Sequence, residues 1–354
     1  MAQETQGSGR NNDGLIAALA VAAGAIGAAA AVRAWLRSRA ALDLNGKNIL
    51  ITGGSRGLGL ILARKLAAQG ARIVICARDA EELTRARQDI ATTSPDAPPV
   101  ITLVCDLTEK AQIKQLIEGA QAQLGGPIEV LIHNAGIIQV GPMETQTEAD
   151  YEEAMNIHFW AAYHLAHEVL PSMRTRRAGR IAFVASLGGK APIPHMLPYC
   201  TSKFALVGFG EGLRAELLKD NIFVTTICPG TIRTGSPRNA YFKGQHDKEY
   251  TWFYMSDSLP GISQSADACA NEIIDAVVHG DAEIITSLPG KALALFHGIL
   301  PGVTSDLMGQ VNKILPAPGG IGTERRKGHE SQMLISLGIL TVLTEKAEED
   351  NNQK

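Results

Sequence analysis

The sequence predicts an α/β protein with a doubly wound, parallel sheet. After residue 47, short segments rich in Ile and Val alternate with longer helical patterns, as in proteins whose parallel strands are joined by crossover helices. Strands are expected over Asn48–Thr52, Arg72–Ala77, Val100–Cys105, Val130–His133, Arg180–Ala185, Phe223–Cys228 and Glu283–Ser287. Helices are expected to begin near Gly57, Asp79, Glu109, Thr147, Pro198 and Ser265. Because ligands of such sheets bind beyond the carboxyl ends of the strands, the functional site is expected at that edge.

Length and composition favour one large domain with extensions over two small domains. The chain has 354 residues, of which 45% are hydrophobic and 19% are charged. Its net charge of -3 and the lack of a long Lys/Arg block argue against nucleic acid as a partner. The cysteines are widely spaced without a CxxC pair, so no metal site or disulfide framework is expected and a reducing compartment fits best. For the His164 and His167 pair, surface or packing roles are favoured over zinc binding.

An uncharged segment near the N-terminus predicts a membrane helix. Gly14–Val32 contains nineteen residues without a charge, which is about the length needed to cross a bilayer roughly 30 Å thick. Arg33, Arg37 and Arg39 follow it, so the positive-inside rule predicts that the rest of the chain faces the cytoplasm. A cleaved signal peptide and an alanine-rich helix packed on the domain are the alternatives. A signal peptide would carry its positive charges before the apolar run rather than after it.

A glycine-rich turn follows the first predicted strand. Gly53, Gly57 and Gly59 lie where the strand ends at Thr52 and a helix begins. Glycines there let the backbone approach a pyrophosphate, whose charge is stabilised by amide N–H groups and by the N-terminus of the helix. Glycine spacing alone is a weak signal, but the strand before it and the helix after it favour a dinucleotide site.

A tyrosine and a lysine lie four residues apart on a predicted helix. Tyr199 and Lys203 therefore project from one face, and Ser186 lies thirteen residues before the tyrosine. A phenol has an unperturbed pKa of about 10, so proton transfer near neutral pH needs a cation that favours the phenolate. Lowering the pKa of Tyr199 by roughly three units takes about 4 kcal/mol. Lys203 and a cationic cofactor ring could together supply that energy.

These motifs together resemble the short-chain dehydrogenase/reductase family over about Lys47 to Leu288. The family's TGxxxGxG motif falls on Thr52 to Gly59, and its NNAG motif falls on His133 to Gly136, where His133 replaces the first asparagine. Pro229-Gly230 follows the sixth predicted strand. The resemblance implies a Rossmann-like sheet of seven strands in the order 3-2-1-4-5-6-7, and a homo-oligomer.

The resemblance also implies an oxidoreductase that interconverts a carbonyl and an alcohol by hydride transfer. Tyr199 would exchange a proton with the substrate oxygen, Ser186 would hydrogen-bond that oxygen, and Lys203 would lower the pKa of the tyrosine and bind the nicotinamide ribose. Asn156 would support a water chain to Lys203. It is assigned because it lies mid-helix between the Asn134 motif and Ser186, and a helix-surface amide is the alternative.

The expected cofactor contacts surround the ends of the strands. By resemblance, Asp106 would contact the adenine and Asn134 would support the backbone near the nicotinamide ribose, whereas both would otherwise be turn residues. The full expected set is Thr52, Gly53, Ser55, Arg56, Gly57, Leu58, Gly59, Arg78, Asp106, Leu107, Asn134, Ala135, Gly136, Tyr199, Lys203, Pro229, Gly230 and Thr231.

Charge at the end of the second strand predicts NADP(H) as the cofactor. A ribose 2′-hydroxyl is usually met by an acidic side chain there, whereas a 2′-phosphate calls for arginine. Ala77 and Arg78 end this strand, and Arg56 in the glycine turn can reach the same region. Asp79 is expected to cap the following helix.

The predicted domain organisation has three parts. Residues 1–46 hold the hydrophobic segment, residues 47–288 form the catalytic domain, and residues 289–354 form a helical extension with an acidic tail. Between 231 and 264 the periodicity weakens, which is typical of a lid over a substrate pocket, with a plain surface loop as the alternative. Met333–Leu343 is expected to be a docking helix or interfacial segment, and Glu345–Lys354 is expected to be disordered.

The favoured function is that of a membrane-associated carbonyl reductase or alcohol dehydrogenase. A lipophilic substrate is expected because the first strand begins about fifteen residues after the predicted anchor. A sugar-nucleotide epimerase or dehydratase would need a larger C-terminal substrate domain. A dinucleotide-binding scaffold or redox sensor without turnover would have no evident need for Ser186, Tyr199 and Lys203.

Overall fold

The computed structural model describes residues 21, 24–25, 27–28, 31–35, 37–258, 263–331 and 342–353. The chain divides into two compact units, Met1–Leu42 and Asp43–Lys354. In the first unit, the described residues between 21 and 39 are helical. Within the described part of the chain, no helix is both long and apolar enough to cross a bilayer. Most of the segment 14–32 lies outside the described residues, so the membrane helix stays a prediction.

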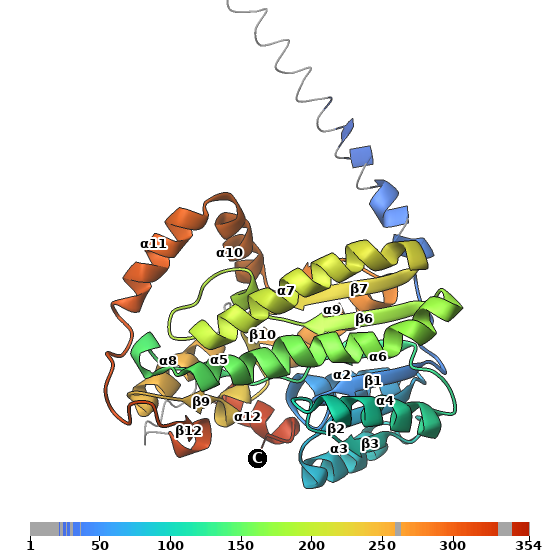
Figure 1. Cartoon of the computed structure of the whole chain (residues 1–354), viewed down its shortest axis with the longest axis horizontal. Helices are drawn as coiled ribbons and strands as arrows, with labels where there is room; N and C mark the ends of the chain where they lie inside the picture. The colour runs from blue at the N-terminus through green and yellow to red at the C-terminus, as the bar shows by residue number, and fades with distance from the viewer. Residues whose placement is uncertain are drawn as a thin grey trace, which may run out of the picture. The chain divides into compact units, whose positions relative to one another are not determined.

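The predicted strands form one parallel sheet (Figure 1). Its order, β11-β7-β6-β4-β1-β2-β3, confirms the predicted order. The central strands are buried on both faces, which explains their continuous apolar sequences. The strands are β1 (Asn48–Thr52), β2 (Arg72–Ala77), β3 (Ile101–Val104), β4 (Val130–His133), β6 (Gly179–Val184), β7 (Ile222–Cys228) and β11 (Glu283–Ile285).

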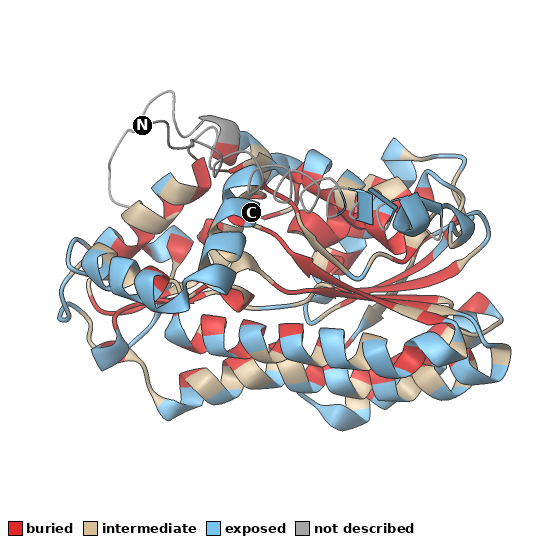
Figure 2. Cartoon of the chain, turned by 90° about the horizontal axis from the view of Figure 1, so that it is seen from above, coloured by how far each residue is buried: buried red, intermediate tan, exposed pale blue. Residues whose placement is uncertain are grey.

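Helices cover both faces of the sheet, and the buried residues gather in the sheet and on the helix sides turned toward it (Figure 2). On one face, α4 (Lys110–Leu124), α6 (Ala161–Arg176) and α7 (Leu197–Leu217) share an apolar core with the strands. The other face carries α2 (Gly57–Ala67), α3 (Ala80–Thr93) and α9 (Ala266–His279), with α2 packed between the other two.

The predicted helix starts agree closely with the structure. Asp79, Glu109, Thr147 and Ser265 are the N-cap residues of α3, α4, α5 (Glu148–Met155) and α9. The Asp79 carboxylate accepts hydrogen bonds from the amides of Glu81 and Glu82, which confirms its capping role. A π-helical turn, Asn156–Trp160, joins α5 to α6.

The region 231–264 contains more regular structure than a plain loop. It holds β8 (Ile232–Arg233), β9 (Tyr241–Phe242), α8 (His246–Ser258) and β10 (Gln264–Ser265). β8 pairs with β10, and β9 lies between β5 (Gln139–Val140) and β12 (Arg326–Lys327) in a second small sheet. An apolar cluster joins α8 to the start of α7 through Met196, Cys200, Tyr250 and Tyr254. This region therefore packs beside the helix that carries Tyr199.

The C-terminal extension corrects one prediction. α10 (Leu288–Ile299) and α11 (Pro301–Asn312) form where the helical extension was expected. The acidic end is not disordered, however, because Val342–Asp350 forms helix α12 and the next three residues pack on the domain. The predicted segment Met333–Leu343 lies almost wholly outside the described residues.

Candidate functional site

The turn from β1 into α2 has the geometry expected of a phosphate cradle. Gly53 and Gly57 adopt φ of +64° and +56°, in the left-handed region that favours glycine. A side chain at Gly53 would place its Cβ 2.8 Å from the Cα of Ala135, and one at Gly59 would place it 2.1 Å from the Gly53 carbonyl oxygen. No side chain caps the first turn of α2. An anion at this end of α2 would meet the first amide groups of the helix, of which that of Gly57 donates to the carbonyl of Asn351 at 2.9 Å.

The ends of β1 and β4 are tied together by hydrogen bonds. The Thr52 hydroxyl accepts from the amides of Asn134 and Ala135 at 3.1 and 3.2 Å, and it lies 3.0 Å from Nδ1 of His133. The Asn134 side chain donates to the carbonyls of Thr52 and Gly53. Asn134 thus supports the backbone of the glycine turn, and the chain places these residues of the two motifs side by side.

Ser186 and Tyr199 come together at the carboxyl end of β6. Ser186 is the N-cap of a short 3₁₀ turn, Leu187–Gly189, and its Oγ accepts from the amide of Gly188 at 3.1 Å. A hydrogen bond from Ser186 lowers the pKa of Tyr199, but burial has the larger effect and raises that pKa to about 12. Without a cofactor ring, the groups of the protein do not lower this pKa, so the predicted depression, which includes that ring, stays a prediction.

Lys203 lies one turn after Tyr199 and is 4% exposed. Its Nζ donates to the carbonyl of Val184 at 2.9 Å and lies 5.7 Å from the centroid of the tyrosine ring. Burial lowers the pKa of this amine to about 7. A pKa of about 7 places the change of charge of Lys203 near neutral pH.

The match to known proteins covers this whole arrangement. The family described as short chain dehydrogenase matches residues 47–242, from β1 through β9. The chain belongs to the short-chain dehydrogenase family. This confirms the family resemblance and the expectation of an oxidoreductase that uses a nicotinamide dinucleotide.

Relatives within the family are similar over part of their length. A dehydrogenase/reductase SDR family protein 7-like from Anopheles gambiae is 39% identical over 206 residues, or 57% of this chain and 64% of that protein. The mouse 3-ketodihydrosphingosine reductase is 33% identical over 190 residues, or 53% and 57%. The chain thus spans less than two thirds of either relative. A metagenomic short-chain oxidoreductase solved in complex with NADP is 25% identical, with a TM-score of 0.55 over 70% of this chain and 99% of that one.

The structure does not bring Asn156 into contact with the other short-chain dehydrogenase site residues. Its side chain is exposed, at the first position of the π-helical turn. His158, two residues later, is fully buried and packs edge-on against the ring of Tyr199 with centroids 5.5 Å apart. The helix-surface alternative therefore describes the position of Asn156 better than the predicted role does.

His158 was missed because only the spacing to the Asn134 motif was used. Its Nε2 accepts from the amide of Ile137 at 3.2 Å, so the proton is on Nδ1, which lies 2.7 Å from the Ser202 hydroxyl. Ser202 in turn donates to the carbonyl of Tyr199. A side chain at Gly136 would place its Cβ 2.8 Å from Nε2 of His158 and 3.7 Å from Nζ of Lys203. The imidazole therefore ties the loop after β4 to the helix of Tyr199.

The remaining predicted residues lie at the ends of their strands. The Asp106 carboxylate accepts from the amide and hydroxyl of Thr108, as the turn interpretation expects. The carbonyl of Pro229 accepts from the amide of Leu187, which fixes the loop after β7 against the Ser186 turn. A side chain at Gly230 would clash with Ser287.

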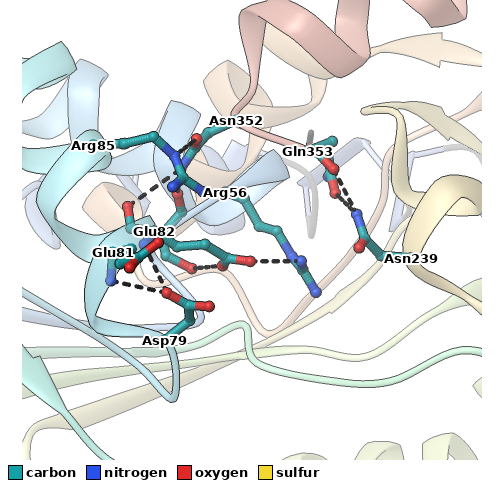
Figure 3. A network of polar contacts seen from close by, with 9 residues as sticks. Arg56, Asp79, Glu81, Glu82, Arg85, Asn239, Asn352 and Gln353 are labelled. Carbon is teal, nitrogen blue, oxygen red and sulfur yellow. Dashed lines mark hydrogen bonds and ion pairs between the residues drawn. The ribbon is translucent and has the colours of Figure 1, made fainter.

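The arginines expected to meet the 2′-phosphate lie in two places. Arg78 follows β2 and is exposed. Arg56, in the glycine turn, forms an ion pair with Glu82 at 2.9 Å (Figure 3), and the Ser55 hydroxyl donates to the same carboxylate. A carboxylate in the first turn of α3, which the sequence did not single out, therefore contacts the glycine turn.

His133 and His158 should make the protein sensitive to acid. Burial lowers the pKa of His133 to about 3 and the pKa of His158 well below its ordinary value, and the charge of Lys203 lowers both further. In the unfolded chain both should titrate near pH 6.5. Below that pH the unfolded chain binds protons that the folded chain does not, so stability falls as pH falls.

We expect the free energy of unfolding to fall by about 1 kcal/mol for each of these histidines between pH 6 and pH 5. His158→Asn should remove the contribution of one histidine, about half of the combined loss, as measured by urea unfolding at the two pH values. His329→Asn, at an exposed histidine, is the control and should leave the loss unchanged. An equal loss in His158→Asn and the parent protein would contradict the assignment.

Proposed function

We propose that the protein is an NADP(H)-dependent oxidoreductase that interconverts a carbonyl and an alcohol by hydride transfer, working as a reductase. The proposal rests on one observation: the hydrogen-bonded Ser186–Tyr199 pair and the buried Lys203 lie at the same sheet edge as the glycine turn. Residues able to hold a dinucleotide and residues able to move a proton thus share one site.

The protonation states favour reduction. With a pKa of about 12, Tyr199 holds its proton at neutral pH and can donate it to the oxygen of a carbonyl. Ser186 can hydrogen-bond the same oxygen. Bound NADPH would supply the hydride. This arrangement makes the tyrosine the general acid and needs no phenolate before the reaction.

Lys203 suits the role of holding the cofactor ribose. A lysine ammonium has three N–H donors, and the carbonyl of Val184 takes one of them. Because its pKa is low, the charge of the amine depends on what binds beside it, and any hydrogen-bond acceptor in this buried place stabilises the cation. A charged Lys203 would in turn stabilise the phenolate that forms when Tyr199 has given up its proton.

Tyr199→Phe should bind NADPH as the parent protein does and lose about 10²–10⁴-fold in turnover, because only the acidic hydroxyl is removed. The measurement is NADPH oxidation across a panel of aldehydes, ketones, steroids and retinoids, with protein kept in detergent. Turnover within a few fold of the parent rate would contradict the assignment. NADPH binding without turnover on any panel member, in the parent protein, would favour the scaffold or sensor instead.

Preference for NADP(H) is supported by the charges at the end of β2. Arg78 is exposed there, and the carboxylate of Asp79 is engaged in capping α3. Arg56 already forms an ion pair with Glu82, so Arg78 is the better candidate to bind a 2′-phosphate. The structural neighbour in complex with NADP agrees with this choice.

Arg78→Ser should lower kcat/KM for NADPH by about tenfold or more, because a charge-assisted hydrogen bond to phosphate is worth roughly 1.5–3 kcal/mol. Its kcat/KM for NADH should change little, since NADH lacks the phosphate. Arg87→Ser, at an exposed arginine of α3, is the matched control. An equal loss with both cofactors, or a parent enzyme that prefers NADH, would refute the preference.

A lipophilic substrate is supported by apolar surface around the site. The cluster that joins α8 to α7 packs against Tyr199 itself. Beyond it, α10 and α11 expose stripes of apolar residues at helical spacing, namely Leu288, Leu295 and Ile299 on one helix and Val303, Leu307 and Ile314 on and just after the other. The mouse relative is named for the reduction of 3-ketodihydrosphingosine, a lipid ketone.

We further propose that the chain is held at a membrane by residues 14–32, with the catalytic domain in the cytoplasm. The full chain should stay with membranes through alkaline carbonate extraction. Substituting Ser for Leu295, Ile299, Val303 and Leu307 should not release it, because the anchor would remain. Release of the parent chain into the supernatant would refute the anchor.

A further inference from the structure

Residues 342–353, which we term the closing segment, lie against the glycine turn that follows β1. The segment consists of α12 and the three residues after it, Asn351, Asn352 and Gln353, of which the first two form a turn. Asn351 and Gln353 are each only 6% exposed, although they are polar and lie almost three hundred residues from the turn in sequence. This burial indicates a fitted contact rather than a loose tail.

The first contact takes an amide of the phosphate cradle. The amide of Gly57, the first residue of α2, donates to the carbonyl of Asn351 at 2.9 Å. Nε2 of Gln353 lies 2.8 Å from the point where a Cβ at Gly57 would stand. The segment therefore occupies the space that a side chain at Gly57 would fill. A pyrophosphate bound at the start of α2 needs that same amide and that same space.

The second contact bridges the glycine turn and α3. The Asn352 side chain donates to the carbonyls of Ser55 and Glu82 at 2.8 and 3.2 Å and accepts from Nε of Arg85 at 2.9 Å (Figure 3). The adenosine half of a dinucleotide would have to run from the turn toward the end of β2, where Arg56 and Arg78 lie. Asn352 forms hydrogen bonds with the polar groups at the start of this path.

Further bonds hold the segment in place from both sides. Gln353 accepts from the Asn239 side chain through its backbone carbonyl and its Oε1, at 3.0 and 2.8 Å (Figure 3). Arg64 of α2 donates to the carbonyl of Asp350 at 2.7 Å. Arg238 lies 3.7 Å from the buried carboxylate of Glu348. The segment is thus fastened to α2 on one side and to the region 231–264 on the other.

We propose that the closing segment is an autoinhibitory plug that competes with the dinucleotide for the glycine turn. The inference rests on the proposed function, since it requires the turn to bind the pyrophosphate. One amide cannot donate fully to both Asn351 and a phosphate, and the acidic side chains of α12, among them Glu345, Glu348 and Asp350, disfavour a phosphate nearby. Cofactor binding must therefore displace the segment. The apparent Kd for the cofactor equals the Kd of the open form divided by the fraction of chains in which the segment is open.

The test measures NADPH binding to the full chain by equilibrium titration of tryptophan fluorescence. Asn352→Ala combined with Gln353→Ala removes the four side-chain bonds that these two residues form and leaves every proposed cofactor residue intact. We expect the Kd for NADPH to fall about fivefold to tenfold, as the loss of these bonds allows. Lys346→Ala, at an exposed residue of α12, is the control and should keep the parent Kd.

Hydrogen exchange of the parent protein gives an independent readout. Amides within residues 342–353 should exchange faster when NADPH is saturating, because the plug has been displaced. An unchanged or higher Kd in the double variant, or slower exchange of the segment with NADPH, would overturn the plug and leave the proposed function standing. If neither the parent nor the double variant binds NADPH or NADH, the proposed function fails and the plug fails with it.

Discussion

A buried amine governs the electrostatics of the whole site. Lys203 is almost wholly buried, and its amine donates to the carbonyl of Val184. The surrounding groups must therefore be compatible with a positive charge at this amine. His133 and His158 meet this requirement by staying neutral, and each of their low pKa values includes a contribution from that charge. Tyr199 keeps its proton for a different reason, because its own burial raises its pKa. The amine becomes a stronger cation only when something anionic or polar lies beside it.

Most of the fold could be predicted from the sequence because parallel strands buried on both faces leave a clear pattern. β1, β2 and β4 are unbroken apolar runs, and their polar ends, such as Thr52 and His133, mark where the site lies. Family membership followed from motifs at those ends. The small strands β8, β9 and β10 could not be predicted, because each has two residues and depends on partners far away in sequence.

The site was less predictable than the fold wherever tertiary packing decides. Spacing alone favoured Asn156, yet the π-helical turn presents His158 to the site and leaves the asparagine in solvent. The effect of burial on the pKa values of Tyr199 and Lys203 could not be predicted, because desolvation cannot be read from a four-residue spacing. The acidic end of the chain was expected to be disordered from its composition, but backbone groups, which composition does not describe, hold it on the domain.

The π-helical turn also limits how this part of the chain can change. It accommodates one residue more than an α-helical turn would, within an otherwise continuous rod from α5 to α6. Deleting the additional residue would restore a regular α-helical turn and leave α5 and α6 with the same faces toward the domain. Deleting a residue within α5 or α6 would instead rotate one part of the rod by about 100° against the other. A change of chain length is therefore tolerated at the widened turn, whereas the regular helices on either side accept only exchanges of side chains at constant length.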